Sequence, residues 1–233
     1  MTHLVQINQL SKKIGNKQVL QNIDLTIAEG KIVGLLGSNG SGKTTLMKIL
    51  AGLMHPSSGD CYVAGKRVGL ATREDVSLMP DTFSVDRSMK VIEAIHFYRD
   101  FFAGFDMTKA KDMLSFMRLN EQDRIRALSK GMVERLALVL TLSRNARLYM
   151  LDEPIGGIDA VARDKILDAL LDYYTPESTI ILSTHLIYDI EKIFDEVIFI
   201  KQGSIVLQEE VEEIRLKRKT SVHDLFKEVY AEC

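Results

Sequence analysis

The spacing of apolar and polar positions divides this chain into three stretches, and the first has the pattern of strands. In residues 3–30 apolar side chains alternate with polar ones, as at Ile23 and Leu25, and Gly15-Asn16 separates two such runs. Alternation at period two predicts half-buried strands, and a Gly-Asn pair predicts a tight turn. We therefore expect short strands joined by turns.

A fully apolar strand and a helix follow. After the run at residues 32–36, apolar positions recur with helical spacing at Leu46, Ile49, Leu50 and Leu53. Spacing of three and four residues places these side chains on one face of a helix. Beyond that helix we expect short strands at residues 61–63, 66–68 and 76–79.

The second stretch, from Ser88 to about residue 145, has helical spacing throughout. It predicts a helix around residues 91–102, another around 110–117, and a third that Ser129 caps and whose apolar residues 136–142 are buried. Five aromatic side chains near its start form either helix core, the more usual role of such a stripe, or a surface for a partner. They are Phe97, Tyr98, Phe101, Phe102 and Phe105.

The third stretch alternates strands and helices. Parallel strands joined by helices form a sheet that is covered on both faces, so this alternation predicts an α/β fold. A chain of 233 residues suffices for one large domain. The expected strands are residues 148–151, 179–182, 197–200 and 205–207, and the expected helices are 160–173, 186–194 and 222–230.

The strand at residues 32–36 leads into a glycine-rich turn, GSNGSGKTT. A strand, such a turn and a helix form the context in which G-x-x-x-x-G-K-[ST] binds phosphate. The glycines let successive N–H groups turn inward, and the helix adds the positive end of its dipole. Lys43 is a cation at a helix N-terminus, which a polyphosphate would stabilise, and Thr44 offers a hydroxyl to Mg²⁺. An incidental turn is the alternative, but the flanking elements favour a nucleotide site formed by Gly37, Ser38, Asn39, Gly40, Ser41, Gly42, Lys43, Thr44 and Thr45.

Two other predicted strands end in polar residues. One leads into Asp152 and Glu153, and another leads into Ser183-Thr184-His185. The carboxyl ends of parallel strands share one edge of a sheet, where ligands of open α/β sheets bind. Because adjacent side chains on a strand point in opposite directions, Asp152 and Glu153 have different roles. We expect Asp152 to approach Mg²⁺, Glu153 to orient or deprotonate a water, and His185 to hold the γ-phosphate.

Each of these residues also has a purely structural interpretation. Asp152 and Glu153 would form an acidic surface turn, and Ser183 or Thr184 would cap the next helix. A position directly after an apolar strand, in a chain that also has a phosphate loop, favours the functional interpretation. For Asp159 both interpretations stay open, since it also stands where it would cap the helix at residues 160–173.

Composition and charge exclude several classes of function. The formal net charge of −2 gives no basic field for nucleic acid or an anionic bilayer, so we expect no nucleic-acid partner. Cys61 and Cys233 match neither a metal nor a redox spacing and fit a reducing cytosol. The sequence shows neither the pattern of a signal peptide nor an apolar run of the roughly eighteen residues that a membrane helix needs. We expect any membrane contact to come through a partner.

Together these motifs resemble the ATP-binding cassette (ABC) family, the nucleotide-binding subunits of ABC transporters. GSNGSGKTT is similar to the Walker A motif, LSKGM at residues 128–132 to the signature LSGGQ, and LYMLDEP at residues 148–154 to Walker B with its glutamate. GGID at residues 156–159 resembles the D-loop, and Ser183-Thr184-His185 resembles the switch histidine motif. The resemblance extends from Leu4 to about Val229, and the order of signature, LDEP and STH makes it specific.

The resemblance implies a P-loop NTPase fold, with a RecA-like core, an antiparallel β subdomain and a helical signature subdomain. The ABC ATPase domain would span residues 1–220, with its helical subdomain at about 88–145, and residues 221–233 would form a short C-terminal helix. Two cassettes, in a homodimer or a heterodimer, would face each other head to tail. Ser129 and Gly131 of one would then complete the ATP site of the other, since they begin a helix whose N-terminus favours anions.

The resemblance also implies catalysis and a partner. Glu153, His185 and Lys43 would be catalytic, and Thr44, Asp81 and Asp152 would bind Mg²⁺. The chain would be an ATPase with ATP and Mg²⁺ as cofactors, held at the inner face of the cell membrane by a separate transmembrane permease that it powers. The C-terminal helix with Leu225 and Phe226 resembles that of export-type cassettes. Two alternatives are a soluble ABC ATPase without a transport role and a low-turnover half of a heterodimer.

Four residues depart from the family pattern. Ile14 stands where an aromatic side chain usually stacks on adenine, and Asp81 replaces the usual glutamine near Mg²⁺. Lys130 and Met132 replace the first glycine and the glutamine of the signature. Because Lys43, Asp152, Glu153 and His185 are all present, the sequence still predicts a working ATPase site.

Overall fold

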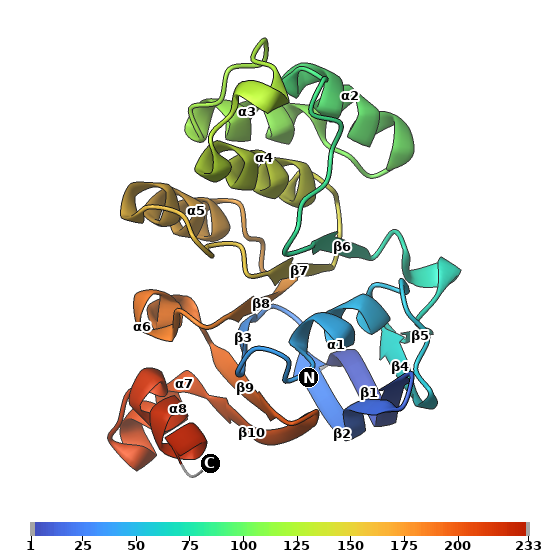
Figure 1. Cartoon of the computed structure of the whole chain (residues 1–233), viewed down its shortest axis with the longest axis vertical. Coiled ribbons are helices and arrows are strands. Elements are labelled where there is room, and N and C mark those ends of the chain that lie inside the picture. Colours follow the sequence, from blue (N-terminus) through green and yellow to red (C-terminus); the bar gives the residue numbers. More distant parts are fainter. Residues whose placement is uncertain (1–2, 232–233) are drawn as a thin grey trace.

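The computed structural model of the chain describes residues 3–231 (Figure 1). A six-stranded sheet forms its centre, and only the edge strand β10 is antiparallel to its neighbour. This sheet confirms the predicted α/β class. The order of its strands is β10 (Ser204–Glu210), β9 (Glu196–Lys201), β3 (Ile32–Leu36), β8 (Thr179–Thr184), β7 (Leu148–Asp152) and β6 (Val76–Met79).

A second, antiparallel sheet of four strands packs beside the first. Its first two strands have 12 residues each and meet at Gly15-Asn16, so the turn was predicted correctly but the strands are longer than expected. Register shifts in this pair, and positive φ angles at Gln9 and Asn22, interrupt the alternation that sequence analysis reads as separate short strands. The strand order is β2 (Lys17–Ala28), β1 (His3–Ile14), β4 (Ser58–Val63) and β5 (Lys66–Arg67).

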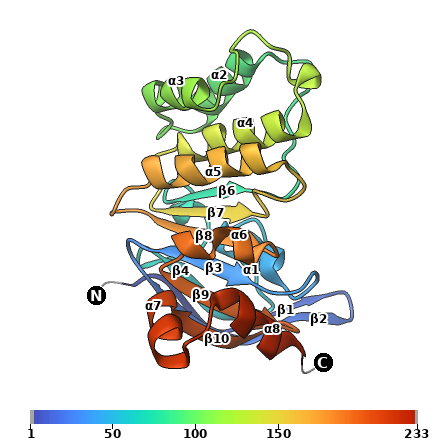
Figure 2. The same cartoon turned by 90° about the vertical axis from the view of Figure 1, so that its left-hand side faces the viewer.

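The predicted helical stretch forms α2 (Val91–Phe101), α3 (Met107–Phe116) and α4 (Lys130–Leu142) at one end of the molecule (Figures 1 and 2). Residues 136–142 of α4 are buried, as expected. The aromatic group is divided between the two interpretations that the sequence left open. Phe105 is buried and Tyr98 and Phe102 pack against the core, whereas Phe97 and Phe101 are 43% and 69% exposed.

Two predicted helices are shorter than expected. Helix α1 (Lys43–Leu50) ends before Leu53, which is 67% exposed, because Gly52 turns the chain at φ +70°. The helix expected at residues 186–194 is reduced to α6 (Ile187–Ile190) and a 3₁₀ turn at Glu191–Ile193. The chain then inserts Phe194 over Gly34, whose missing side chain leaves room for the ring.

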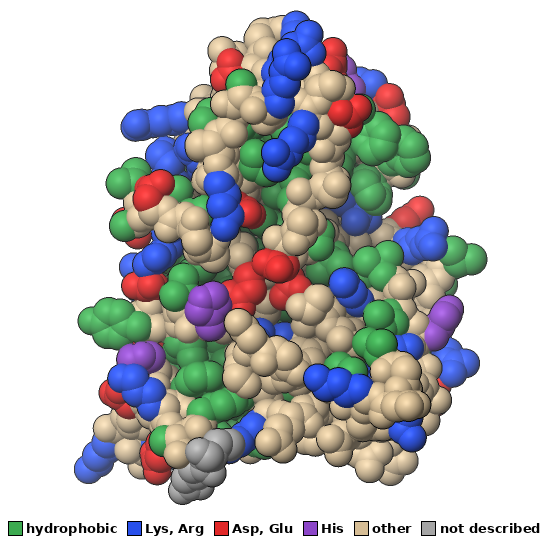
Figure 3. Space-filling view, viewed as in Figure 1, with side chains coloured by type: hydrophobic (Ala, Val, Ile, Leu, Met, Phe, Trp, Pro, Cys, Tyr) green, Lys and Arg blue, Asp and Glu red, His purple; other side chains and the backbone are tan. Residues whose placement is uncertain are grey.

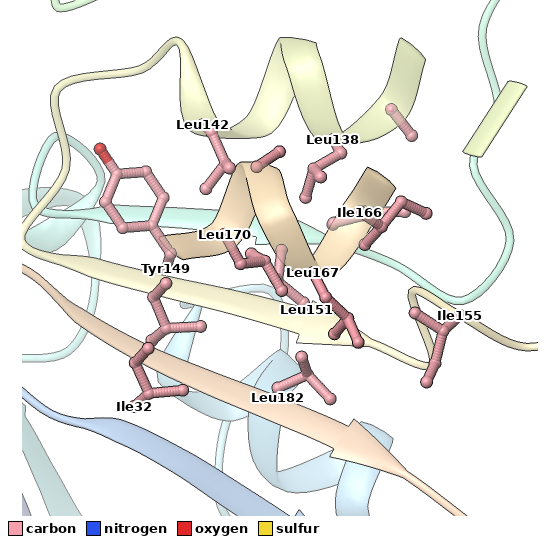
Figure 4. Close-up of a cluster of buried hydrophobic side chains, with 14 of the residues drawn as sticks. Ile32, Leu138, Leu142, Tyr149, Leu151, Ile155, Ile166, Leu167, Leu170 and Leu182 are labelled. Atoms are coloured by element: carbon pink, nitrogen blue, oxygen red, sulfur yellow. The ribbon is translucent and has the colours of Figure 1, made fainter. Parts of the chain in front are cut away.

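The two faces of the central sheet carry separate cores, because side chains alternate along each strand. Leu151 and Leu182 face α4 and α5 (Ala160–Asp172), and Figure 4 shows this cluster. Met150 and Ile181 point to the other face, where they join α1 and the second sheet. Helices α4 and α5 therefore cover one face of the central sheet, and α1 and the second sheet cover the other. The carboxyl edge of the central sheet lies between these two coverings.

The end of the described chain packs onto the central sheet. Helix α7 (Val211–Glu213) leads through a π-helical turn at Ile214–Arg218 to α8 (Val222–Ala231). Phe226 of α8 packs edge-on against Phe199 of β9, with ring centroids 5.4 Å apart. The division of the chain at residue 220 stays a prediction, as does the extent of the helical subdomain.

Candidate active site

The glycine-rich turn connects β3 to α1 in a backbone conformation that its glycines make possible. Gly42 precedes α1 at φ +112°, and a Cβ there would lie 2.6 Å from Cδ2 of Leu20. At Gly37 a Cβ would lie 2.5 Å from the carbonyl oxygen of Ile200. Any larger residue at either position would displace the loop. The sequence therefore folds locally into a tight cradle at the positive end of a helix.

Lys43 is folded into this loop. Its side chain is buried, and Nζ donates to the carbonyl oxygens of Gly37 (2.7 Å) and Ser38 (3.2 Å). Burial lowers the pKa of Lys43, and the nearby carboxylates of Glu153 and Asp152 oppose this shift. In the described part of the chain the buried hydroxyl of Ser41 has no hydrogen-bond partner. The loop thus holds a desolvated ammonium and an unsatisfied hydroxyl, both of which a phosphate would satisfy.

The ends of β7 and β8 join through Ser183. Its hydroxyl donates to Oδ1 of Asp152 over 2.6 Å and accepts from the backbone N–H of Glu153 over 3.1 Å. The same N–H also donates to the carbonyl oxygen of Ser183. These bonds hold Glu153 at φ +54°, a conformation that is unusual for a residue with a side chain. Asp152 and Glu153 consequently point to different neighbours, as the sequence predicts.

Glu153 contacts the predicted switch histidine. Its Oε2 lies 2.9 Å from Nδ1 of His185, whose side chain is about half exposed. Burial raises the pKa of Glu153, and the opposing influences of His185 and Lys43 do not cancel this effect. A carboxylate whose pKa is raised toward neutrality is a better proton acceptor, as a general base requires.

A cavity of about 590 Å³ brings most of the predicted site residues together. Figure 3 shows acidic side chains gathered in the middle of this face of the molecule, with a histidine beside them. Gly37, Ser38 and Ser41 form the loop behind the cavity, and Ser129 and Gly131 do not line it. The predicted residues that do line it are Asn39, Gly40, Gly42, Lys43, Thr44, Thr45, Asp81, Asp152, Glu153 and His185.

The signature segment begins α4 on one side of this cavity. Ser129 caps the helix by accepting from the backbone N–H of Met132, which confirms the predicted cap. Gly131 faces α5, because a Cβ there would lie 3.5 Å from Cβ of Ala162. Lys130 does line the cavity, and its Nζ lies 2.6 Å from the position that a Cβ of Gly157 would occupy. Of the signature residues 128–132, all of which the structure describes, Lys130 is the one that lines the cavity of its own chain.

The family assignment follows from a comparison with known protein families. The profile of the family described as "ABC transporter" matches residues 20–156, which is more than half of the chain and includes the phosphate loop, the signature and the end of β7. The chain belongs to this family. It is an ABC ATPase, the ATP-binding subunit of an ABC transporter.

Individual relatives and solved structures agree with this assignment. The chain is 30% identical over 215 residues to the ABC transporter ATP-binding protein YtrB of Bacillus subtilis, covering 91% of this chain and 74% of the relative. It is 32% identical to an uncharacterised ABC transporter ATP-binding protein of Methanocaldococcus jannaschii, covering 90% and 79%. A solved ATP-binding subunit of an ABC transporter superposes with a TM-score of 0.85 at 25% identity, covering 97% and 98%. The predicted P-loop NTPase fold is thereby confirmed.

Sequence analysis missed two features of this ABC ATPase. Lys17 and Val19 of β2 line the cavity, and no local pattern relates them to a loop some twenty residues away. Ser183 was assigned a helix-capping alternative, but its hydroxyl orients Asp152 instead. The hydroxyl of Thr184 accepts from the backbone N–H of Leu186, just before α6 begins, as a residue that caps a helix would. No local signal in the sequence identified this role of Ser183, because it depends on the pairing of β7 with β8.

Three smaller predictions can also be compared with the cassette's structure. Asp159 caps α5 by accepting from the backbone N–H of Ala162, so the structural interpretation of this residue is confirmed. Ile14 lines the cavity and is 49% exposed, in the place where the resemblance expects a side chain against the base. Cys233 lies outside the described residues, and Cys61 is buried, where burial raises its pKa to about 11.

The cavity's residues suit a magnesium-bound polyphosphate. Thr44, Asp81 and Asp152 offer the hard oxygen ligands that Mg²⁺ prefers. Within residues 3–231 no group of three or more acidic, histidine or cysteine side chains is arranged to hold a metal by itself. Mg²⁺ is usually bound by one or two carboxylates together with phosphate oxygens, so this donor set fits an ion that arrives with the nucleotide.

Proposed function

We propose that this chain hydrolyses ATP to power a separate transmembrane permease. The observation that carries the proposal is the convergence of Lys43, Asp152, Glu153 and His185 on one cavity at the carboxyl edge of the sheet. A phosphate loop alone would serve many nucleotide enzymes. Beside it, the partly buried carboxylate of Glu153, whose pKa is raised, adds the means to activate water.

Each residue of the cavity has a distinct role in the proposal. Lys43 binds the β- and γ-phosphates, and its bonds to the carbonyl oxygens of Gly37 and Ser38 are exchanged for stronger, charge-assisted bonds to phosphate oxygens. Thr44, Asp152 and Asp81 would hold Mg²⁺, which would supply charge stabilisation at the transferred phosphoryl group. Glu153 accepts the proton of the attacking water, and His185 orients Glu153 through its Nδ1 and contacts the γ-phosphate.

The site of one chain is incomplete in the proposed mechanism, and a second cassette completes it. Ser129 and Gly131 do not line the cavity of their own chain, yet Ser129 is exposed at the N-terminus of a 13-residue helix. Such a helix end favours an anion. In a head-to-tail pair it would face the partner's γ-phosphate. ATP would then join the two cassettes, and hydrolysis would release them.

The exposed part of the aromatic group supports a permease partner. Phe97 and Phe101 of α2 lie with their ring centroids 4.4 Å apart and their planes tilted by 34°. Figure 3 shows exposed hydrophobic side chains over this helix. Phe101 also lines a groove of about 660 Å³ with Arg73 and Arg144. Exposed aromatic side chains beside a groove are typical of an interaction surface. Within the described residues no helix is long and apolar enough to cross a bilayer.

We also propose export as the direction of transport, on the resemblance of the helix with Leu225 and Phe226 to that of export-type cassettes. Import is the alternative. Reconstitution of the chain with its permease in vesicles of known orientation separates them, because accumulation of cargo on the side that holds the cassette would contradict export. A low-turnover role in a heterodimer is the second candidate, and robust ATPase activity of the chain alone would exclude it.

Complementation between two inactive variants tests the shared site. Lys43→Ala removes the phosphate-binding ammonium, and Ser129→Asp retains a good helix cap while it places a negative charge against phosphate. Each variant alone has two damaged sites per dimer. In a mixed dimer one site carries both substitutions and the other carries neither. An equimolar mixture should therefore recover about a quarter of wild-type ATPase activity.

The measurement is phosphate release by each variant and by the mixture at saturating MgATP. Each variant measured alone at the same total concentration is the control. A mixture no more active than the separate variants would contradict the head-to-tail arrangement. Failure of the wild-type chain to bind or hydrolyse MgATP would contradict the proposed function itself.

A further inference from the structure

Helix α8 contacts the strand that forms the back wall of the phosphate loop. The hydroxyl of Tyr230 donates to the carbonyl oxygen of Ile200, the last apolar residue of β9, over 2.7 Å. The Tyr230 ring stacks on Phe226, with centroids 4.1 Å apart, and Nζ of Lys201 lies 5.6 Å from the ring centroid. Tyr230 is therefore held on several sides, and its hydroxyl has a fixed direction.

Ile200 in turn contacts the loop. Its carbonyl oxygen lies 2.5 Å, and its Cγ2 atom 3.0 Å, from the position that a Cβ of Gly37 would occupy. The following turn makes a second contact, because the backbone N–H of Gly203 donates to the carbonyl oxygen of Ser41 over 3.0 Å. The end of β9 therefore sets the shape of the loop from behind, at the point where the loop leaves β3.

We propose that Tyr230 is a positioning residue for nucleotide binding. Its hydroxyl holds the Ile200 carbonyl against the phosphate loop, and so keeps the loop's N–H groups directed at the phosphates. Tyr230 does not line the cavity, so its effect on the phosphate loop is indirect and passes through Ile200. This inference rests on the proposed function, because it assumes that the loop binds a nucleotide.

Tyr230→Phe tests the inference, since it removes the hydroxyl and keeps the ring between Phe226 and Lys201. The matched control is Tyr149→Phe, because the Tyr149 hydroxyl also donates to a backbone carbonyl, that of Arg144, at the opposite end of β7 from Asp152. Tyr230→Phe loses the hydrogen bond to Ile200, and Tyr149→Phe loses both the bond to Arg144 and the bond that its hydroxyl accepts from the backbone N–H of Ala146. The net contribution of one neutral hydrogen bond corresponds to about a three- to tenfold change in an equilibrium constant.

Calorimetric titration with MgADP and steady-state ATPase kinetics provide the readout. For Tyr230→Phe we expect the Kd of MgADP and the KM for ATP to rise about three- to tenfold with kcat unchanged. For Tyr149→Phe we expect a loss of thermal stability at least as large as that of Tyr230→Phe, with no change in Kd or KM. Equal nucleotide affinity in wild type and Tyr230→Phe would overturn the inference. A wild-type chain that fails to bind MgADP would overturn the proposed function as well. The two failures are distinguishable, because in the first the wild-type chain still binds MgADP.

Discussion

Glu153→Gln separates the chemistry of the site from its architecture. Glutamine has nearly the same shape as glutamate and can still contact Nδ1 of His185, so the cavity keeps its form. It cannot accept a proton from water. The backbone strain at φ +54° is the same for both residues, and the two bonds from the residue 153 N–H to Ser183 are retained. Any change in rate therefore reports the loss of the base.

The expected loss is large. Removal of a general base costs 10²–10⁴-fold in rate, or about 3–5 kcal/mol in activation free energy. Burial raises the pKa of Glu153 above its ordinary value of 4.5, and the base is active only when ionised. The wild-type rate should therefore fall as the pH is lowered through this raised pKa. This fall in rate is the acidic limb of the pH–rate profile. It should be absent in Glu153→Gln, because the titrating carboxyl group is gone.

Although Glu153→Gln should lower the rate of ATP hydrolysis, it should raise the free energy of unfolding. A carboxyl whose folded-state pKa is raised above its unfolded value costs stability at pH values above the raised pKa, and this cost disappears below the unfolded pKa. Glu153→Gln removes the cost. We expect its melting temperature to equal or exceed that of wild type at neutral pH, and the difference to shrink as the pH is lowered.

The assays are phosphate release from MgATP between pH 5 and 8, titration with MgADP, and thermal unfolding over the same range. Glu134→Gln is the matched control: burial also raises the pKa of Glu134, but this side chain does not line the cavity. It should keep wild-type turnover. Turnover of Glu153→Gln within tenfold of wild type, or an unchanged acidic limb, would refute the assignment of Glu153 as the base.

Two further substitutions test other parts of the site and its surroundings. Ser183→Ala removes the 2.6 Å hydrogen bond to buried Asp152. We expect the free energy of unfolding in urea to fall by about 1–3 kcal/mol and ATP hydrolysis to require more Mg²⁺. An unchanged Mg²⁺ requirement would show that Ser183 does not orient Asp152 for the metal. Phe101→Ser should abolish co-purification with the permease while ATPase activity of the chain alone persists. The similarly exposed Leu216→Ser is the control, and equal co-purification of both variants would contradict a docking role for Phe101.

The parts of the fold that the sequence predicted are those with a local cause. Residues 136–142 form a helix because their run is too long and too apolar for a surface strand, and β6 has the predicted limits because Pro80 ends it. The phosphate loop and the acidic end of β7 were predictable because their residue types stand at fixed distances from an apolar strand. The spacing of apolar residues, and the residue types in the turns, are visible within a few positions of each of these elements, so the sequence alone predicts them.

The parts that the sequence did not predict depend on residues distant in the chain. Leu53 continues the helical spacing, but the turn at Gly52 ends the helix before it. Phe194 fits over Gly34, which is 160 positions earlier, and the helix before it is correspondingly short. The role of Ser183 follows from the pairing of β7 with β8, which places it opposite Asp152. No local pattern contains such pairings.

The two charged departures from the family pattern offset each other in the cavity. Asp81 and Lys130 both line the cavity. Both also affect the pKa of nearby Glu134, which burial raises, Lys130 lowers and Asp81 raises. A carboxylate near the phosphates opposes the entry of a polyphosphate, whereas an ammonium in the same cavity favours it. Relative to a cassette with glutamine and glycine at these two positions, the net charge of the cavity is therefore unchanged.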